Sequence, residues 1–227
     1  MDNQPETEKM KNNYYVKTID YDDTKDFILN KHYAQKMPQI IWAFGLFDLS
    51  NELQGICTIG KPPTPNLCKG IMGGEYKEKV YELNRLCINE GLDKNILSFF
   101  VGGVLKKLKS EDIVLVSYAD EGMDHHGYIY QATNWLYTGM TDQKRTYIYT
   151  PNGTHPRHYT HDYENLRKVL SCKHRYIYFT GKSKKIYRNL LKYPILDYPK
   201  GDNKRYKFGD KLKTKVINTT TGEIFYE

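Results

Sequence analysis

The chain has 227 residues and a mass of 26.7 kDa, with 39% hydrophobic and 27% charged residues. It can bury a core of its own, which excludes a disulfide-stapled or metal-nucleated miniprotein. No apolar run approaches the roughly 18 residues of a membrane span, and the polar residues 1–13 lack the apolar segment of a signal peptide. Four widely spaced cysteines fit reduced thiols. These features predict a cytosolic protein.

Basic charge is concentrated near the C-terminus. Residues 1–163 hold 18 Lys and Arg against 21 Asp and Glu, whereas residues 164–227 hold 16 against 6, a net charge of +10. Six tyrosines are interleaved with these cations: Tyr176, Tyr178, Tyr187, Tyr193, Tyr198 and Tyr206. A cationic surface with aromatic plates suits a phosphate backbone and unstacked bases, so we predict a nucleic-acid partner. The alternatives are a merely solvated basic surface and tyrosines that only build strands.

The first part of the chain alternates between strand and helix patterns. In chain order the predictions are a disordered lead (1–12), a strand (14–19), a helix (22–33), paired strands (40–46 and 53–59) and a long loop (62–74). The loop is predicted from its prolines and glycines, and its length is typical of functional loops.

The second part of the chain predicts a sheet core followed by further strands. In chain order the predictions are a strand (80–88), a helix (96–109), a buried strand (113–119), a helix (127–136) closed by Gly139, strands (147–150 and 176–180) and a hairpin (213–226). Gly102 and Gly103 lie inside the helix 96–109 at a cost of about 1 kcal/mol each, which close helix-to-sheet packing would offset.

The order of these elements resembles the GNAT acetyltransferase superfamily, and several separated motifs make the resemblance specific. They are ELNRL (82–86), VSYAD (116–120), GYIYQATNWLYTG (127–139), HPRHY (155–159), KHRYIYF (173–179) and YPILDYPK (193–200). Together, over about residues 14–200, they resemble the Mom family of phage DNA-modification proteins. The resemblance implies an α/β (α+β) fold with a GNAT-like, mixed and mostly antiparallel central sheet flanked by helices. We expect this domain at 13–200, with a basic hairpin extension at 201–227.

The resemblance also implies a function. Mom proteins convert adenine N6 in phage DNA to a carbamoylmethyl (acetamido) derivative, which protects the DNA from host restriction. The expected partner is therefore double-stranded DNA, with no membrane, in the cytoplasm of the infected bacterial host; a homodimer is compatible with the sequence. An enzyme acting on a base within a duplex must flip it out and stack it on aromatic or apolar groups. The basic, tyrosine-rich C-terminal part agrees with that requirement.

Arg85 and the start of the 96–109 helix are candidates for binding an anion. Arg85 is the only arginine in the first 144 residues, and its guanidinium could clamp a phosphate, carboxylate or acyl intermediate; the alternative is an ion pair with Glu82 or another acid. The helix start, with Lys94, Asn95 and Ser98, could bind a pyrophosphate or leaving group. Ser98 could instead be a cap.

The resemblance implies acetyl-CoA or a related acyl donor. GNAT enzymes usually carry a Gln/Arg-x-x-Gly-x-Gly/Ala loop at this strand-to-helix junction, which admits the pyrophosphate of acetyl-CoA. Here the loop reads NEGLDKN, with only Gly91. Asp93 would repel phosphate, whereas Lys94 would attract it.

Asp120 and Tyr130 are candidate catalytic residues. Asp120 ends the buried strand, at the edge where ligands of open α/β sheets gather. It could take the N6 proton or orient a Tyr or His that does so, or it could cap the following helix. Tyr130 lies where many GNAT enzymes place a tyrosine that serves the leaving thiolate. With Tyr128 and Tyr137 nearby, one of the three is expected to be core packing.

His32 and Tyr33 are candidates for binding the flipped adenine, and the C-terminal cations for binding its phosphates. The pair ends the 22–33 helix, where GNAT folds shape the acceptor side; a histidine there could instead be a surface residue that stabilises the helix dipole. The expected phosphate contacts are Lys182, Lys184, Lys185 and Arg188. Further histidines show no convincing metal-ligand spacing: His125, His126, His155, His158 and His161. We therefore expect no metal site, although metal dependence stays open.

Two other functions fit the sequence. One is a non-catalytic DNA-binding anti-restriction protein, and the other is a GNAT N-acetyltransferase acting on another amine. The candidates Asp120, Arg85 and Ser98 favour an enzyme, because a passive binder needs basic surface alone. The basic C-terminal part argues against small cationic acceptors.

Overall fold

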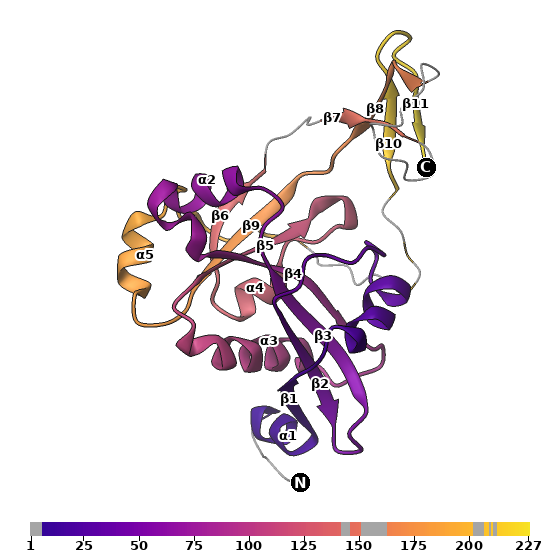
Figure 1. Ribbon diagram of the computed structural model, residues 1–227. Helices are drawn as coiled ribbons and strands as arrows, with labels where there is room; N and C mark the ends of the chain where they lie inside the picture. Colours follow the sequence, from indigo (N-terminus) through magenta and orange to yellow (C-terminus); the bar gives the residue numbers. More distant parts are fainter. Residues whose placement is uncertain (1–5, 142–145, 151–162, 202–206, 209, 211–212) are drawn as a thin grey trace.

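A seven-stranded sheet forms the centre of the protein (Figure 1). The structure is a computed structural model that describes residues 6–141, 146–150, 163–201, 207–208, 210 and 213–227. In sheet order the strands are β1 (Tyr14–Thr18), β2 (Trp42–Asp48), β3 (Leu53–Gly60), β4 (Val80–Ile88), β5 (Val114–Asp120), β9 (Lys173–Phe179) and β6 (Leu136–Met140). Only β4 and β5 run parallel. The expected α/β fold with a mostly antiparallel sheet is confirmed.

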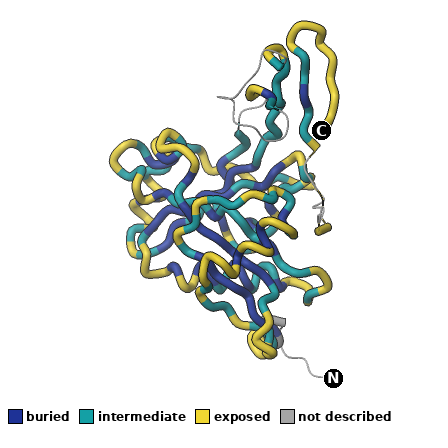
Figure 2. Tube along the Cα trace, turned by 45° about the vertical axis from the view of Figure 1, so that its right-hand side comes forward, coloured by how far each residue is buried: buried dark blue, intermediate teal, exposed yellow. Residues whose placement is uncertain are grey.

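Helices cover both faces of this sheet (Figures 1 and 2). On one face, α3 (Ile96–Lys107) and α4 (Tyr128–Ala132) bury their apolar side chains against alternate residues of β2 to β5. On the other face, α2 (Pro65–Tyr76) and α5 (Lys184–Leu190) pack on Val80, Val116 and Ile177. We call these the α3 face and the α2 face. None of the helices in the described ranges is long and apolar enough to cross a membrane.

Shorter helical segments connect these elements. They are η1 (Asp22–Thr24), η2 (Phe27–Lys31), η3 (Lys77–Lys79), η4 (Leu108–Ser110) and η5 (Glu121–Met123). The η2 segment packs Phe27 and Ile28 on Ile56 of β3 and Cys87 of β4. Residues 25 and 26 between η1 and η2 are helical too, so the helix expected at 22–33 is present over residues 22–31 and ends before His32.

A second sheet of four strands projects from the main body (Figure 1). Its strands are β11 (Ile224–Tyr226), β10 (Lys215–Asn218), β8 (Leu166–Val169) and β7 (Thr146–Ile148), all paired antiparallel. The expected C-terminal hairpin is formed by β10 and β11. Its pairing with β8 was not predicted, and that pairing buries Val216 completely. We call this sheet the arm.

Two loop expectations were wrong. Most of residues 62–74, expected as a loop, belongs to α2 (Pro65–Tyr76), because Thr64 caps the helix by accepting from the Leu67 amide and Pro65 occupies the first turn. The kink at Gly73, with φ of 78°, marks the glycine-rich part that the sequence pattern did detect. Residues 6–12 are not disordered but belong to α1 (Glu6–Asn13), whose Met10 is buried.

The helix expected over 127–136 is shorter. It ends at Ala132 because Asn134 adopts a left-handed conformation with φ of 60°. Residues 136–140 instead form the edge strand β6, paired with β9. The aromatic and β-branched residues of this stretch suit a strand as well as a helix.

Candidate active site

Strands β4 and β5 separate part of the way along their length. Their parallel pairing stops at Glu82 and Val116. Directly after this point Asn84 is an extra residue relative to β3, which makes a β-bulge. Bulges bend the strand that carries them, so β4 turns away from β5. We call the open end, residues 83–88 of β4 and 117–120 of β5, the fork.

The bulge also decides which side chains of β4 share a face. Regular alternation would place Glu82 and Arg85 on opposite faces of the sheet. With Asn84 as the extra residue, Leu83 and Leu86 both pack into the core of the α3 face. Glu82 and Arg85 therefore both lie on the α2 face.

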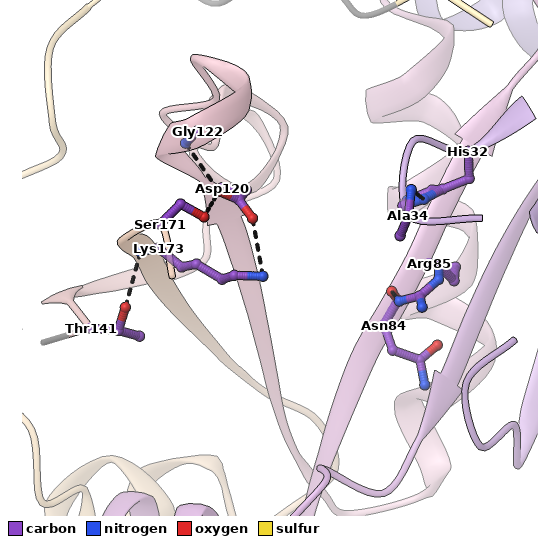
Figure 3. A network of polar contacts seen from close by, with 9 residues as sticks. All are labelled: His32, Ala34, Asn84, Arg85, Asp120, Gly122, Thr141, Ser171 and Lys173. Atoms are coloured by element: carbon purple, nitrogen blue, oxygen red, sulfur yellow. Dashed lines mark hydrogen bonds and ion pairs between the residues drawn. The ribbon is translucent and has the colours of Figure 1, made fainter. Parts of the chain in front are cut away.

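The ends of β5 and β9 bring two more charges to this face. Asp120 and Lys173 are directly opposite one another in the antiparallel pairing. They alternate with Val116 and Ile177, which are buried on the α2 face. Figure 3 shows the Asp120–Lys173 group on one side of the fork and Arg85 with His32 on the other.

Arg85 is held by backbone carbonyl groups. Its Nε and one terminal nitrogen donate to the Lys36 carbonyl at 3.2 and 2.7 Å, and the other terminal nitrogen donates to the Asn84 carbonyl at 2.6 Å. No carboxylate of the described residues lies within ion-pair distance of the Arg85 guanidinium. The alternative of an ion pair between Arg85 and Glu82 is therefore wrong. Burial lowers the pKa of Arg85, yet a guanidinium stays charged at any working pH.

His32 and Tyr33 stack on one another beside Arg85, with ring centroids 4.4 Å apart. The Ala34 amide donates to His32 Nδ1 at 3.0 Å, which leaves the proton of the neutral ring on Nε2. Burial, Arg85 and His125 lower the pKa of His32 to about 3, so the ring is uncharged. Burial and Asp120 raise the pKa of Tyr33 to about 12. The two uncharged, stacked rings form a flat aromatic surface, which we call the His32–Tyr33 wall. Because His32 is buried, the alternative of a surface histidine is wrong.

Asp120 is buried and already has three partners. Its carboxylate accepts from Ser171 Oγ at 2.5 Å and from the Gly122 amide at 3.0 Å, and it pairs with Lys173 Nζ at 3.1 Å. Through the Gly122 contact, Asp120 caps η5. Asp120 therefore does act as a cap, but of η5 and not of the helix expected at 127–136. These contacts fix the Lys173 ammonium at the fork (Figure 3).

Glu82 is a site residue that sequence reasoning missed. Its carboxylate has no hydrogen bond or ion pair to any described residue, while Lys173 and Arg85 lie close enough to stabilise its charge. Burial outweighs both cations and raises the pKa of Glu82 to about 7. Glu82 is the first residue of the ELNRL motif, but no sequence pattern indicated the bulge that brings it to the same face as Arg85.

Tyr130 lies at the closed end of the fork on the α3 face. The Tyr130 hydroxyl and Ser117 Oγ share a hydrogen bond of 2.7 Å. Ser117 Oγ also donates to the Leu83 carbonyl at 2.8 Å. The ring packs between Trp135 and Tyr176, and burial raises the pKa of Tyr130. Tyr130 is therefore a core residue whose polar end reaches the strand separation.

The start of α3 holds the expected donor-binding residues. Asn95 adopts a left-handed conformation as the N-cap, and Ser98 Oγ donates back to the Asn95 carbonyl at 2.8 Å. This contact satisfies a carbonyl and no free amide, so Ser98 does not cap the helix. Lys94 is exposed, and Glu90 accepts from the Phe208 amide at 3.1 Å. Lys31 Nζ, which donates to Asn89 Oδ1 at 2.9 Å, is a second cation close to Glu90. The described residues here carry charges of both signs, so they do not form the purely cationic or glycine-rich cradle that would suit a pyrophosphate group.

The expected phosphate contacts lie away from the fork. Lys184, Lys185 and Arg188 are on α5, and Lys182 directly precedes it; all four are exposed. Residues 180 and 183 contact residues 113 and 112 before the start of β5, whereas Asp120 is at its other end. Lys182 is therefore separated from Asp120 by the length of β5.

Histidines form a small cluster on the α3 face. His126 Nδ1 lies 3.4 Å from His174 Nε2, and the Tyr137 hydroxyl lies 3.0 Å from His174 Nδ1. Within the described residues, no group of three or more His, Cys, Asp and Glu side chains could hold a metal ion. His155, His158 and His161, with the HPRHY motif, lie outside the described residues.

Comparisons with known proteins identify one family. The family described as the Mom protein family matches residues 13–200. No curated protein matches the sequence.

Solved acetyltransferase structures are distantly similar. An N-acetyltransferase from Staphylococcus aureus is 17% identical, with a TM-score of 0.45 over 74% of this chain and 98% of that chain. A spermidine/spermine N-acetyltransferase from Vibrio cholerae is 11% identical, with a TM-score of 0.46 over 79% and 98%. A Bacillus subtilis acetyltransferase in complex with CoA is 10% identical, with a TM-score of 0.41 over 73% and 98%.

Proposed function

Since the chain belongs to the Mom protein family, we propose that it is a transferase that converts adenine N6 in double-stranded phage DNA to its carbamoylmethyl (acetamido) derivative. In that role it acts in the cytoplasm of the infected bacterial host and protects the DNA from restriction. The observation that carries the proposal is the convergence of Glu82, Arg85 and the Asp120–Lys173 pair on one face of the fork, beside the His32–Tyr33 wall.

Glu82 is proposed as the proton acceptor. The exocyclic amine loses one proton when it forms its new bond to carbon, and an acceptor with a pKa near the working pH serves that transfer best. Glu82 has such a pKa, about 7, and no described residue forms a hydrogen bond or ion pair with its carboxylate. Asp120, the base expected from the sequence, has three partners, so we propose that it positions Lys173 instead.

His32 and Tyr33 are proposed to hold the flipped adenine. A base taken out of the duplex needs stacking against flat groups and hydrogen bonds at its edge. The stacked pair supplies aromatic faces, and the proton on His32 Nε2 supplies a donor. Arg85 lies next to them with guanidinium hydrogens beyond those bound to the two carbonyl groups, and these suit a carbonyl oxygen or anion of the donor.

The group donor is proposed to be an activated metabolite that carries a carbamoylmethyl group (–CH2–CONH2) on a leaving group, so that the N6–CH2 bond forms as the bond from CH2 to the leaving group breaks. Such a donor is required because acetyl-CoA, the donor expected from the resemblance with Lys94, Asn95, Ser98 and Arg85 as its contacts, would by itself transfer an acetyl group. The carboxylates at the start of α3 do not suit its pyrophosphate, so we assign no step to CoA. Tyr130 and Ser117, at the closed end of the fork, are the hydroxyl groups available to a leaving group that enters between β4 and β5.

The test is the nucleoside composition of plasmid DNA from cells that express the protein. Mass spectrometry should detect carbamoylmethyladenine with the wild type, much less with Glu82→Gln, and wild-type amounts with Glu75→Gln, an exposed carboxylate on α2. Unmodified adenine with well-expressed wild type would contradict the proposal. In that case tight DNA binding would favour a non-catalytic anti-restriction protein, and acetylation of another amine an N-acetyltransferase.

A further inference from the structure

A dense basic surface lies on α5 and its flanks. Between residues 182 and 192 there are five cations and no Asp or Glu. All five are exposed: Lys182, Lys184, Lys185, Arg188 and Lys192. None of them forms an ion pair with any described residue. We call this surface the α5 track. No ion pair with the described residues neutralises its charges, which is typical of a surface that binds a polyanion.

The α5 track is held rigidly. The Asp112 carboxylate accepts from the Ser183 amide and Ser183 Oγ, both at 2.8 Å, and from the Tyr187 hydroxyl at 3.2 Å. Tyr187 is buried against Phe179. Tyr187 anchors the inner side of α5, and Lys184 and Arg188, four residues apart, are exposed neighbours on its surface. The Asp112 carboxylate thus fixes the helix, and it forms no ion pair with the cations of the α5 track.

The α5 track and the fork are on the same face of the sheet. Tyr187 of α5 packs in the cluster that contains Val80, Val116 and Ile177, and Glu82 and Asp120 alternate onto that face. From the start of β5 to Asp120 the strand rises about 3.3 Å per residue, or roughly 20 Å in all. After α5 the chain turns back toward the fork, because the Tyr193 ring lies 3.4 Å from the Arg175 guanidinium.

We propose that duplex DNA lies along the α2 face, with its target nucleotide at the fork and the phosphates of one flank on the α5 track. This inference rests on the proposed function for the identity of the target base. A duplex rises 3.4 Å per base pair, so a separation of roughly 20 Å corresponds to about six base pairs. The α5 track therefore contacts the DNA on one side of the target nucleotide only. DNA binding requires base pairs on that side, and the α5 track does not contact the base pairs on the other side.

The α3 face offers a matched control. Lys106 and Lys107 are exposed in the last turn of α3. α3 packs on the opposite face of the sheet from α5, so we expect a duplex docked along the α2 face to contact these lysines less than the α5 track. Equal charge changes on α5 and α3 therefore separate docking on one face from general attraction to a basic protein.

The first experiment measures DNA affinity and does not depend on catalysis. A fluorescent 24-base-pair duplex is titrated with wild type, Lys184→Glu/Arg188→Glu and Lys106→Glu/Lys107→Glu, at several salt concentrations, after thermal unfolding has shown that all three are folded. The α5 variant should bind at least about tenfold more weakly, with a smaller salt slope, and the α3 variant within about twofold of wild type. Equal losses in the two variants would overturn the proposal.

The second experiment measures the flank requirement. Duplexes in which the modified adenine is moved stepwise toward one end or the other are treated with cell extract as the donor source. Modification should fall when fewer than about six base pairs remain on one side only, and the α5 variant should lose this asymmetry. A symmetric requirement in the wild type would overturn the proposal. If no adenine is modified, the proposed function fails, while the affinity measurement still decides whether DNA docks on α5.

Discussion

Glu82 is ionised with difficulty because it is buried at the point where β4 and β5 separate. Burial raises its pKa from 4.5 to about 7, although Lys173 and Arg85 act in the other direction. Between these two values the folded protein keeps a proton that the unfolded chain has released. Stability contributed by Glu82 is therefore present at low pH and is lost as the pH rises toward 7. A carboxylate retained at such a cost is typical of a functional site.

We predict that Glu82→Gln changes the pH profile of modification. The wild-type rate should rise with pH through about 7 and then level off, because the carboxylate form accepts the proton. The variant should be at least about 100-fold slower, without that rise. Initial rates between about pH 5 and 8 provide the measurement, with Glu75→Gln as control. A wild-type profile in Glu82→Gln, with Asp120→Asn inactive, would assign the base to Asp120.

Arg85 should not tolerate lysine. A lysine ammonium cannot donate in the same plane to the Lys36 carbonyl from two nitrogens and also to the Asn84 carbonyl. We expect Arg85→Lys to lower modification by about tenfold or more while the far-ultraviolet circular dichroism is unchanged. Lys36→Ala keeps that backbone carbonyl and serves as the control. Full activity of Arg85→Lys would show that only the charge matters.

At the scale of elements, α3 illustrates that two neighbouring glycines can have different roles. Gly103 faces Val16 of β1 so closely that an added Cβ would lie 2.7 Å from the valine methyl group. Gly102 has open space in the same direction. Close packing of helix on sheet, expected for both, is therefore correct for Gly103 alone.

The glycine pair gives a matched stability test. Gly102→Ala should stabilise the protein by about 0.5–1 kcal/mol, because alanine favours the helix and meets no neighbour. Gly103→Ala should destabilise it, because the contact with Val16 costs more than the propensity gains. Urea unfolding of both variants measures the difference. Stabilisation by Gly103→Ala would mean that β1 gives way easily.

The start of α3 is predicted to bind CoA weakly. The Glu90 and Asp93 carboxylates repel a diphosphate and offset the attraction of the two nearby cations, Lys94 and Lys31, so a diphosphate gains little there. We expect 1 mM acetyl-CoA, a concentration chosen to exceed ordinary dissociation constants, to raise the thermal midpoint by less than about 1 °C. Differential scanning fluorimetry is the measurement, and Asp93→Asn is the informative variant. A saturable rise of several degrees would contradict the prediction and show that the protein binds acyl-CoA.

The whole molecule consists of a main body, which holds the fork, and the arm (Figure 1). The arm is built from two distant parts of the chain, because β8 pairs with β7 on one side and with β10 on the other. The buried Val216 lies at its centre. The C-terminal hairpin is thus not an independent appendage.

Deletion of residues 213–227 tests this construction. Without β10, the outer edge of β8 loses its hydrogen-bonded partner, whereas β4 and β5 keep all of theirs. Amide hydrogen exchange should therefore accelerate in Leu166–Val169 and stay unchanged in Val114–Asp120. Slow exchange retained in β8 would show that the arm holds together without its C-terminal half.

Local patterns in the sequence determined much of this protein. Apolar alternation located β4, the continuous run at 113–119 located β5, and an apolar stripe located α3, because each pattern depends on neighbours within a few residues. The motifs around Arg85, Asp120 and Tyr130 indicated the family and directed attention to the fork. The charge asymmetry indicated the basic surface that α5 carries.

Only the tertiary structure decided how these parts meet. The bulge at Asn84 depends on how β4 pairs with β3, and it turns Glu82 and Arg85 to one face, which simple alternation excludes. The pKa of Glu82 depends on burial by distant segments, and the arm depends on pairing across about 50 residues. Strand partners and burial are long-range properties, so the sequence pattern at Glu82 carries no local sign of them.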